Sequence, residues 1–237
     1  MTTLDKLIGD VRIKLLEIGY AGTGKTGAHA ALANAGYKLR IIDLDGNMAP
    51  LRAYVKPEAR KNVEIVTLQD ALQMDKPGGT RGPPQVFAKV MRLLDHWTYK
   101  EADGTVIDLG KPAEWRRDTI LILDNGTRLG DAALRRQLFL TERRRAEWND
   151  WNAAMSDLAD AVELAASELI GCHVCVIFHL KLVGPKTELP KDSREVKEAK
   201  AAVQEIVPFR LYPSALGQTL PPRIGNFFDY ILLFETE

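Results

Sequence analysis

The sequence predicts an α/β fold in which a mostly parallel sheet is flanked by helices. A glycine-rich loop at residues 19–26 fits the pattern GxxxxGK[ST] and follows an apolar run at 13–18. Short apolar runs then alternate with helical patterns, which is typical of parallel strands joined by helices. The chain has 237 residues, of which 46% are hydrophobic, enough for one sizeable core. We therefore expect a single domain over residues 1–237.

The elements of the first half follow in order. We expect a strand at 11–18, the glycine-rich loop, a helix to about residue 35, a strand at 39–44, a helical turn at 48–55 and a strand at 63–66. Gly36 is a good helix stop. The proline- and glycine-rich stretch at 76–84 must be a loop.

The second half begins with an elaboration on the core sheet at residues 76–118. It holds a helix at 86–97 and a small hairpin at 99–109. The expected elements after it are a buried strand at 119–124, two helices or one broken near 148–151 within 131–170, a strand at 173–178 ending at His179, a charged mobile loop at 181–200, and two antiparallel strands at 206–212 and 227–234.

Composition bounds the class of protein. The chain carries 32 basic and 32 acidic residues, so its net charge does not indicate nucleic-acid binding, although a local basic patch could exist. No apolar run reaches the ~18 residues of a membrane span, and the N-terminus lacks the apolar region of a signal peptide. We expect a soluble, cytoplasmic protein without a membrane partner. Cys172 and Cys175 lie in an apolar run and are interpreted as reduced core residues. Their CxxC spacing could also indicate zinc or redox chemistry, but no second cysteine pair exists.

The glycine-rich loop predicts a phosphate site. Its members are Gly19, Tyr20, Ala21, Gly22, Thr23, Gly24, Lys25 and Thr26. Glycines let the backbone curl so that several N–H groups point at one phosphate, and the following helix adds partial positive charge there. Lys25 would reach the β- and γ-phosphates of ATP, and Thr26 would hold Mg²⁺.

Polar residues at strand ends complete the expected site. Asp124 ends an apolar strand and would bind Mg²⁺ directly or through water; alternatively it caps a turn. Asp43 and Asp45 are two residues apart on one strand face, and Asp45 could orient and deprotonate water. Alternatively, Asp43 caps a loop and Asp45 belongs only to a turn. His179 could contact the γ-phosphate and report its loss, or could satisfy a loop carbonyl.

Two basic segments are candidates for contacting single-stranded DNA. Such segments are more often solvated, but Trp148 and Trp151 follow the first of them, and positive charge beside aromatic rings suits single strands. The candidate residues are Arg135, Arg136, Arg143, Arg144, Lys181 and Lys186.

Together these motifs resemble the RecA-like P-loop NTPase core. The order along the chain is the phosphate loop, Ile-Asp-Leu-Asp ending at Asp45, Leu-Ile-Leu-Asp-Asn around Asp124, and Ile-Phe-His ending at His179. RecA-type recombinases place a catalytic acid, usually Glu, where this chain has Asp45. They carry a polar switch residue at the position of His179, followed by a DNA-binding loop.

A narrower resemblance is to compact, phage-encoded RecA-like proteins of the single-strand annealing type. It is carried by His179, by Leu-Gly-Gln-Thr-Leu-Pro at 216–221 and by Phe-Asp at 228–229. The resemblance implies an ATPase that binds single-stranded DNA, promotes annealing or strand exchange in the host cytoplasm, and assembles into rings or filaments. A neighbour's cation would then reach the γ-phosphate, and Arg223 is the candidate, with Lys181 second. A single-strand-binding protein is a further candidate partner.

Two other functions are compatible with the same motifs. The segment Ile-Asp-Leu-Asp-Gly-Asn also resembles partition-type ATPases, but Tyr20 stands where those carry a signature lysine. A nucleic-acid-binding scaffold that holds ATP with little turnover is the third hypothesis, because Asp45 is one carbon shorter than Glu.

Overall fold

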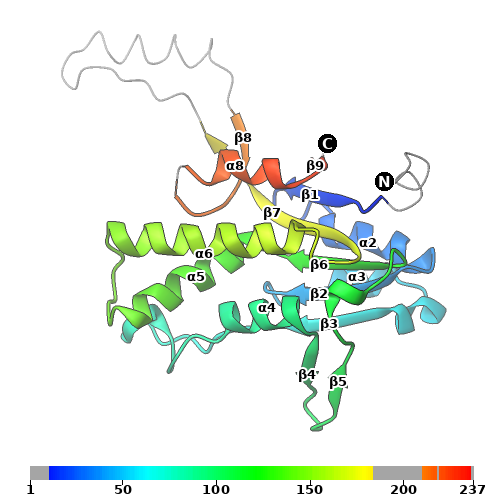
Figure 1. Cartoon of the computed structure of the whole chain (residues 1–237), viewed down its shortest axis with the longest axis horizontal. Helices are drawn as coiled ribbons and strands as arrows, with labels where there is room; N and C mark the ends of the chain where they lie inside the picture. Colours follow the sequence, from blue (N-terminus) through cyan, green and yellow to red (C-terminus); the bar gives the residue numbers. More distant parts are fainter. Residues whose placement is uncertain (1–10, 184–209, 218, 236–237) are drawn as a thin grey trace, which may run out of the picture.

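The computed structural model describes residues 11–183, 210–217 and 219–235. Its main sheet has seven strands in the order β3-β2-β6-β7-β1-β9, with β8 pairing β7. The strands are β1 Lys14–Gly19, β2 Lys38–Asp43, β3 Val63–Thr67, β6 Thr119–Asp124, β7 His173–Val183, β8 Arg210–Pro213 and β9 Tyr230–Phe234. Every pair is parallel except β7 with β8. The predicted α/β class, with a mostly parallel sheet flanked by helices, is confirmed (Figure 1).

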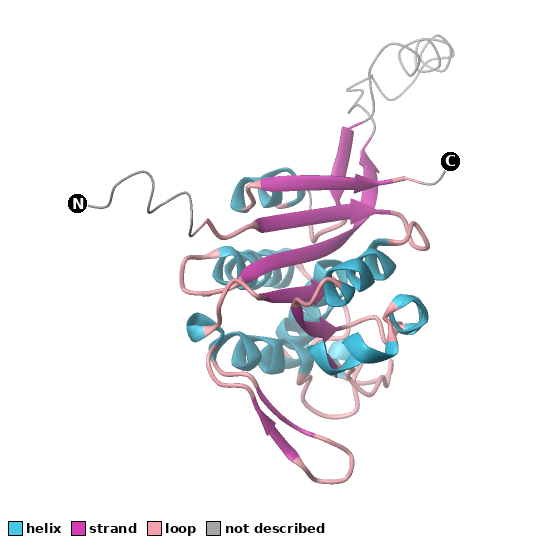
Figure 2. Ribbon diagram, turned by 90° about the vertical axis from the view of Figure 1, so that its right-hand side faces the viewer, coloured by secondary structure: helices cyan, strands magenta, loops and turns pink. Residues whose placement is uncertain are grey.

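Helices cover both faces of this sheet (Figures 1 and 2). One face packs against α2 and α3, and the other packs against α4, α5 and α6. The helices are α2 Lys25–Asn34, α3 Ala49–Tyr54, α4 Val86–Asp95, α5 Gly126–Leu140, α6 Trp148–Ala166 and α8 Pro221–Ile224, with short 3₁₀ turns at Pro57–Asn62, Pro77–Gly79, Pro112–Glu114 and Gly225–Phe227. No helix among these described elements is both long and apolar enough to cross a membrane.

Strand β6 shows why the central strands form where they do. All six of its residues are buried. Leu121 and Leu123 join the core under α4–α6, whereas Ile120 and Ile122 join the core under α2 and α3. A strand covered on both faces needs apolar side chains at every position, which is how its sequence reads. Because β1, β2, β6 and β7 pair parallel, their carboxyl ends lie at the same edge of the sheet.

The region at 76–118 divides into a core part and a projecting part. Helix α4 packs its apolar side on the sheet, and Trp97 after it is fully buried. The predicted hairpin is present as β4 Thr98–Lys100 and β5 Val106–Asp108, and it extends away from the body of the molecule (Figures 1 and 2). Only the hairpin is thus peripheral to the core.

Several predicted boundaries differ from the structure. The helical stretch after β6 begins at Gly126 rather than residue 131, and its break lies before Trp148. Strand β7 continues past His179 to Val183, because β8 pairs with its extension. Of the two C-terminal strands expected to be antiparallel, β8 is antiparallel, but β9 pairs parallel to β1. Lys181 lies in β7, and the rest of the predicted loop, from residue 184 to 200, falls outside the described residues.

Candidate nucleotide site

The glycine-rich loop connects β1 to α2 and has the backbone that its sequence predicts. Gly22 and Gly24 have φ angles of 84° and 91°, in the left-handed region that favours glycine. Gly24 is followed at once by Lys25, the first residue of α2. The loop therefore ends at a helix N-terminus, where unpaired N–H groups attract an anion.

Lys25 folds back over this loop. Its Nζ donates hydrogen bonds to the carbonyls of Gly19 at 2.8 Å and Tyr20 at 2.6 Å, and contacts Thr23 Oγ1 at 3.3 Å. Burial lowers the pKa of Lys25, while the nearby carboxylates of Asp124, Glu17 and Asp45 oppose that shift. The ammonium group is thus held at the loop, where phosphate oxygens can replace its carbonyl acceptors.

The two residues predicted to hold Mg²⁺ are in contact. Thr26 Oγ1 donates a hydrogen bond of 2.7 Å to Asp124 Oδ2. Asp124 is only 4% exposed, and burial raises its pKa to about 6, although the Thr26 hydrogen bond works the other way. The carboxylates of Asp45 and Asp43 raise it further. A hydroxyl beside a carboxylate is a donor set that fits Mg²⁺.

Asp45 belongs to a polar network at the same sheet edge. Its carboxylate accepts hydrogen bonds from Asn125 Nδ2 and, at 3.0 Å, from Arg128 Nε. His179 Nε2 lies 3.1 Å from Asn125 Nδ2 and 3.6 Å from Asp45 Oδ2. His179 is the largest cause of a lowered pKa at Asp45, Arg128 adds to it, and burial opposes it. Asp45 is therefore an ionised carboxylate at neutral pH.

Asp43 has a different role from Asp45. One of its oxygens accepts from the backbone N–H groups of Asp45 at 3.1 Å and Gly46 at 2.8 Å, and the other accepts from Thr67 Oγ1 at 2.9 Å. The prediction that Asp43 and Asp45 share a strand face is wrong, because β2 ends at Asp43 and the alternation stops there. Asp43 shapes the turn that presents Asp45.

Three members of the network were not predicted from the sequence: Asn125, Thr127 and Arg128. Asn125 is the N-cap of α5, its Oδ1 accepting from the N–H of Arg128 at 2.8 Å. Thr127 Oγ1 accepts from the backbone N–H of His179 at 3.2 Å. The signal was available, since Asn directly after a buried strand is a favoured helix cap. Because the predicted helix began at residue 131 rather than Gly126, Asn125 was not recognised as its N-cap.

One cavity unites most of these groups. It has a volume of about 440 Å³. Its lining residues are Ala21, Gly22, Gly24, Lys25, Thr26, Gly27, Ala28, Asp45, Asn47, Pro50, Tyr54, Asp124 and His179. The structure thus brings the predicted residues Lys25, Asp45, Asp124 and His179 around a common space.

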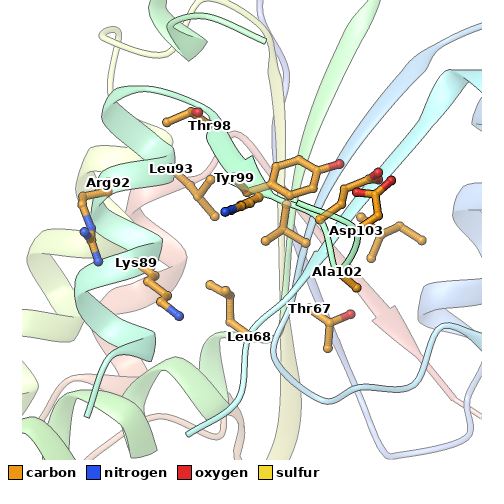
Figure 3. Close-up of a pocket in the computed structure, with 13 residues that line it drawn as sticks. Thr67, Leu68, Lys89, Arg92, Leu93, Thr98, Tyr99, Ala102 and Asp103 are labelled. Atoms are coloured by element: carbon orange, nitrogen blue, oxygen red, sulfur yellow. The ribbon is translucent and has the colours of Figure 1, made fainter. Parts of the chain in front are cut away.

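A larger cavity, of about 920 Å³, lies elsewhere (Figure 3). It is bounded by the end of β3, by α4 and by the hairpin, with Thr67, Lys89 and Tyr99 among its lining residues. Tyr99 Oη donates to Glu64 at 2.7 Å, and burial together with Glu64 raises its pKa. No residue of the glycine-rich loop lines this space, so it is separate from the candidate nucleotide site.

The arginines predicted to contact DNA fall into two groups. Arg136 pairs with Asp157 at 2.9 Å, and Arg143 pairs with Asp150 at 3.1 Å. These two are held by carboxylates of the chain itself. Arg144 is exposed, as is Trp148, which has 77% of its surface accessible.

The other predicted cations are dispersed. Arg135 lines a cavity of about 260 Å³ that also reaches Asp45 and Arg128, so it lies toward the nucleotide site. Lys181 is exposed on β7, and Arg223 is exposed on α8. Lys186 falls outside the described residues.

Comparisons with known proteins add little. No protein-family model matches this chain, and no curated protein is similar in sequence. Among solved structures, it is similar to an ATPase from the type III secretion system of pathogenic bacteria, with 13% identity and a TM-score of 0.43. The match covers 83% of this chain and 50% of that one. Likeness at this level carries no argument about activity.

Proposed function

We propose that this chain is an ATP- and Mg²⁺-dependent P-loop ATPase of the RecA-like type that acts on single-stranded DNA. The observation that carries the proposal is the single cavity lined by Lys25, Asp45, Asp124 and His179. A phosphate cradle, a metal-binding carboxylate and an ionised acid around one space are the parts that phosphoryl transfer to water requires.

Binding would proceed through the loop and its lysine. The N–H groups at the start of α2 and the ammonium of Lys25 would take the β- and γ-phosphates, with Lys25 exchanging its carbonyl acceptors for phosphate oxygens. Thr26 and Asp124 would hold Mg²⁺, which neutralises charge on the phosphates when bound. A phosphate cradle beside a metal-binding pair is what binding of a nucleoside triphosphate would need.

Asp45 would serve as the base for hydrolysis. Asn125 and Arg128 fix its carboxylate, and its lowered pKa keeps it ionised. It would orient a water molecule and accept its proton as the water oxygen bonds to the γ-phosphorus. The bond from that phosphorus to the bridging oxygen breaks, which leaves ADP and phosphate.

His179 would couple the state of the γ-phosphate to DNA. It contacts Asn125 and sits where β7 leaves the parallel sheet and pairs with β8. A change at His179 would therefore move the β7–β8 extension. On this proposal the exposed Arg144 and Trp148 contact single-stranded DNA during phage recombination by annealing or strand exchange.

The proposal includes an assembly. In a ring or filament within the cytoplasm, the exposed Arg223, or Lys181, would reach a neighbour's γ-phosphate, and a single-strand-binding protein would be a partner on the same DNA. The partition-type alternative is weaker, because Tyr20 occupies its signature lysine position and is 47% exposed.

Phosphate release by Lys25→Ala, with and without single-stranded DNA, tests the proposal. We expect the wild-type rate of phosphate release to rise more with single-stranded DNA than with duplex DNA. The rate of the variant should be lower by at least about 10²-fold. Lys100→Ala, at an exposed position of β4 that lines the separate cavity of about 920 Å³, is the matched control and should keep the wild-type rate.

The other outcomes separate the alternatives. ATP binding without turnover on any DNA would support the scaffold, and stimulation by duplex alone would support the partition-type ATPase. A purified protein with no affinity for ATP would refute all three.

A further inference from the structure

Three side chains with metal-ligating atoms meet in the core on the α2 face of the sheet. They are Glu17 of β1, His29 of α2 and Cys175 of β7, with 3%, 2% and 2% of their surfaces exposed. Their ligand atoms all lie within 4.8 Å of one another. His29 Nε2 is 3.3 Å from Glu17 Oε2 and 4.0 Å from Cys175 Sγ.

The polar contacts of this cluster are made mainly within the cluster itself. Glu17 Oε2 lies 3.3 Å from His29 Nε2, and Glu17 also contacts the Cys175 thiol, but among the described residues no hydrogen bond of good geometry reaches the buried Oε2. A carboxylate oxygen left unpaired in an apolar core is costly, and such groups are usually paired or bound to metal. The surrounding core is apolar, including Ala30, Ala33 and Ile177. A metal ion would satisfy the remaining lone pairs of Glu17 Oε2.

We propose that Glu17, His29 and Cys175 bind one divalent transition-metal ion, of which Zn²⁺ fits best. Carboxylate oxygen, imidazole nitrogen and thiolate sulfur are all zinc ligands, and separations of this size suit a tetrahedral arrangement. The charges of Zn²⁺, one carboxylate and one thiolate sum to zero, which suits a buried position. A water molecule would complete the four ligands.

Binding is coupled to loss of a proton. The thiol proton of Cys175 leaves to solvent as the sulfur–metal bond forms. No oxidant or reductant is needed.

The second cysteine is not part of the cluster. Cys172 is fully buried in the core under α4–α6, whereas Cys175 belongs to the core under α2 and α3. The CxxC spacing therefore does not form a paired-cysteine site, and both thiols are free. Cys172 is instead a matched control, a buried thiol three residues away on the other side of the sheet.

The position of the cluster links it to the nucleotide site. His29 lies one turn after Lys25 on α2, and Glu17 lies two residues before Gly19 on β1. A metal bound here would tie together the strand before the phosphate loop, the helix after it and β7. It would hold the loop from both flanks without entering the nucleotide cavity.

Cobalt substitution tests the site. Chelator-treated full-length chain, free of nucleotide, is titrated with Co²⁺ and followed by its absorption. We expect a thiolate-to-cobalt charge-transfer band that saturates at one equivalent, survives in Cys172→Ser and disappears in Cys175→Ser. Cobalt at Thr26 and Asp124 would give no such band, because those ligands are oxygens.

Two outcomes would overturn the proposal: folded wild-type chain without the band at excess Co²⁺, or a band that persists in Cys175→Ser. A second measurement does not depend on a variant folding. X-ray absorption of zinc-loaded wild-type chain should show one sulfur neighbour with nitrogen or oxygen neighbours. A shell without sulfur would refute the site.

Discussion

The nucleotide site and the arginine-rich segment at 135–145 both carry predicted functions, but the fold treats their charges differently. At the candidate nucleotide site, Asp45 follows β2, Asp124 ends β6 and His179 lies in β7, and all three line one cavity. In the segment, Arg136 and Arg143 turn to Asp157 and Asp150 of the neighbouring helix. Strand pairing brings polar residues at neighbouring strand ends together, whereas arginines in a run of like charge orient toward the nearby carboxylates.

The largest expected effect is that of Asp45→Asn. The amide keeps the shape of the side chain but cannot accept the proton of the attacking water. We expect turnover to fall by about 10²–10⁴-fold, with ATP affinity nearly unchanged, measured by phosphate release and by equilibrium binding. Asp103→Asn, on the exposed hairpin turn, should leave turnover at the wild-type rate. Equal rates for Asp45→Asn and wild type would remove Asp45 as the base.

The next largest effect is that of Asp124 on the pH dependence of the free energy of unfolding. Its pKa is raised from the ordinary value of 3.8 to about 6 in the folded chain, chiefly by burial. Its contribution to stability is therefore full below about pH 4 and is lost as pH rises through about 6. That loss is at most about 3 kcal/mol. Without Mg²⁺ and nucleotide, Asp124→Asn should be the more stable protein at neutral pH, and its advantage should vanish in acid.

Urea unfolding at several pH values measures this difference. A constant difference between Asp124→Asn and wild type across the acid range would contradict the raised pKa. In the wild type, Mg²⁺-dependent nucleotide affinity should weaken below about pH 6, because the carboxylate is then protonated.

Separating Arg143 from Arg144 sharpens the comparison directly. Arg144→Ala should weaken the binding of single-stranded DNA and reduce the slope of log affinity against log salt concentration by about one phosphate contact. Its melting temperature should not change. Arg143→Ala should lower the melting temperature, because it leaves the buried Asp150 without its ion pair, and should leave the affinity for single-stranded DNA unchanged. Fluorescence anisotropy at several salt concentrations and thermal melting provide the two readouts. If Arg143→Ala alone weakened DNA binding, the assignment would be inverted.

The smallest effect is that of Asn125→Ala. Loss of the cap on α5 should cost about 1 kcal/mol of unfolding free energy. Asn125→Ser keeps an oxygen for the N–H of Arg128 and should recover most of that loss. Both variants remove the amide that contacts Asp45 and His179, so both should lower turnover. A serine variant with full activity would show that Asn125 acts only as a cap.

The sequence was informative where chemistry requires fixed spacing. The glycine-rich loop between a strand and a helix and the buried strand ending at Asp124 follow from local patterns, and both elements are present in the structure. Two features could not be predicted locally. The extension of β7 depends on pairing with Arg210–Pro213, and the meeting of Glu17, His29 and Cys175 depends on which strands are neighbours. Both are consequences of long-range topology.

The antiparallel pairing of β7 and β8 fixes a pair of attachment points. Val183 and Arg210 lie opposite each other in its register, so the backbone leaves and re-enters the described structure at adjacent positions. Paired residues of this kind have Cα atoms only about 5 Å apart, and closing a longer or shorter connection costs little. Grafting a short Gly/Ser turn in place of residues 184–209 should therefore preserve the folded sheet and its helices, so the connection can be replaced at this junction.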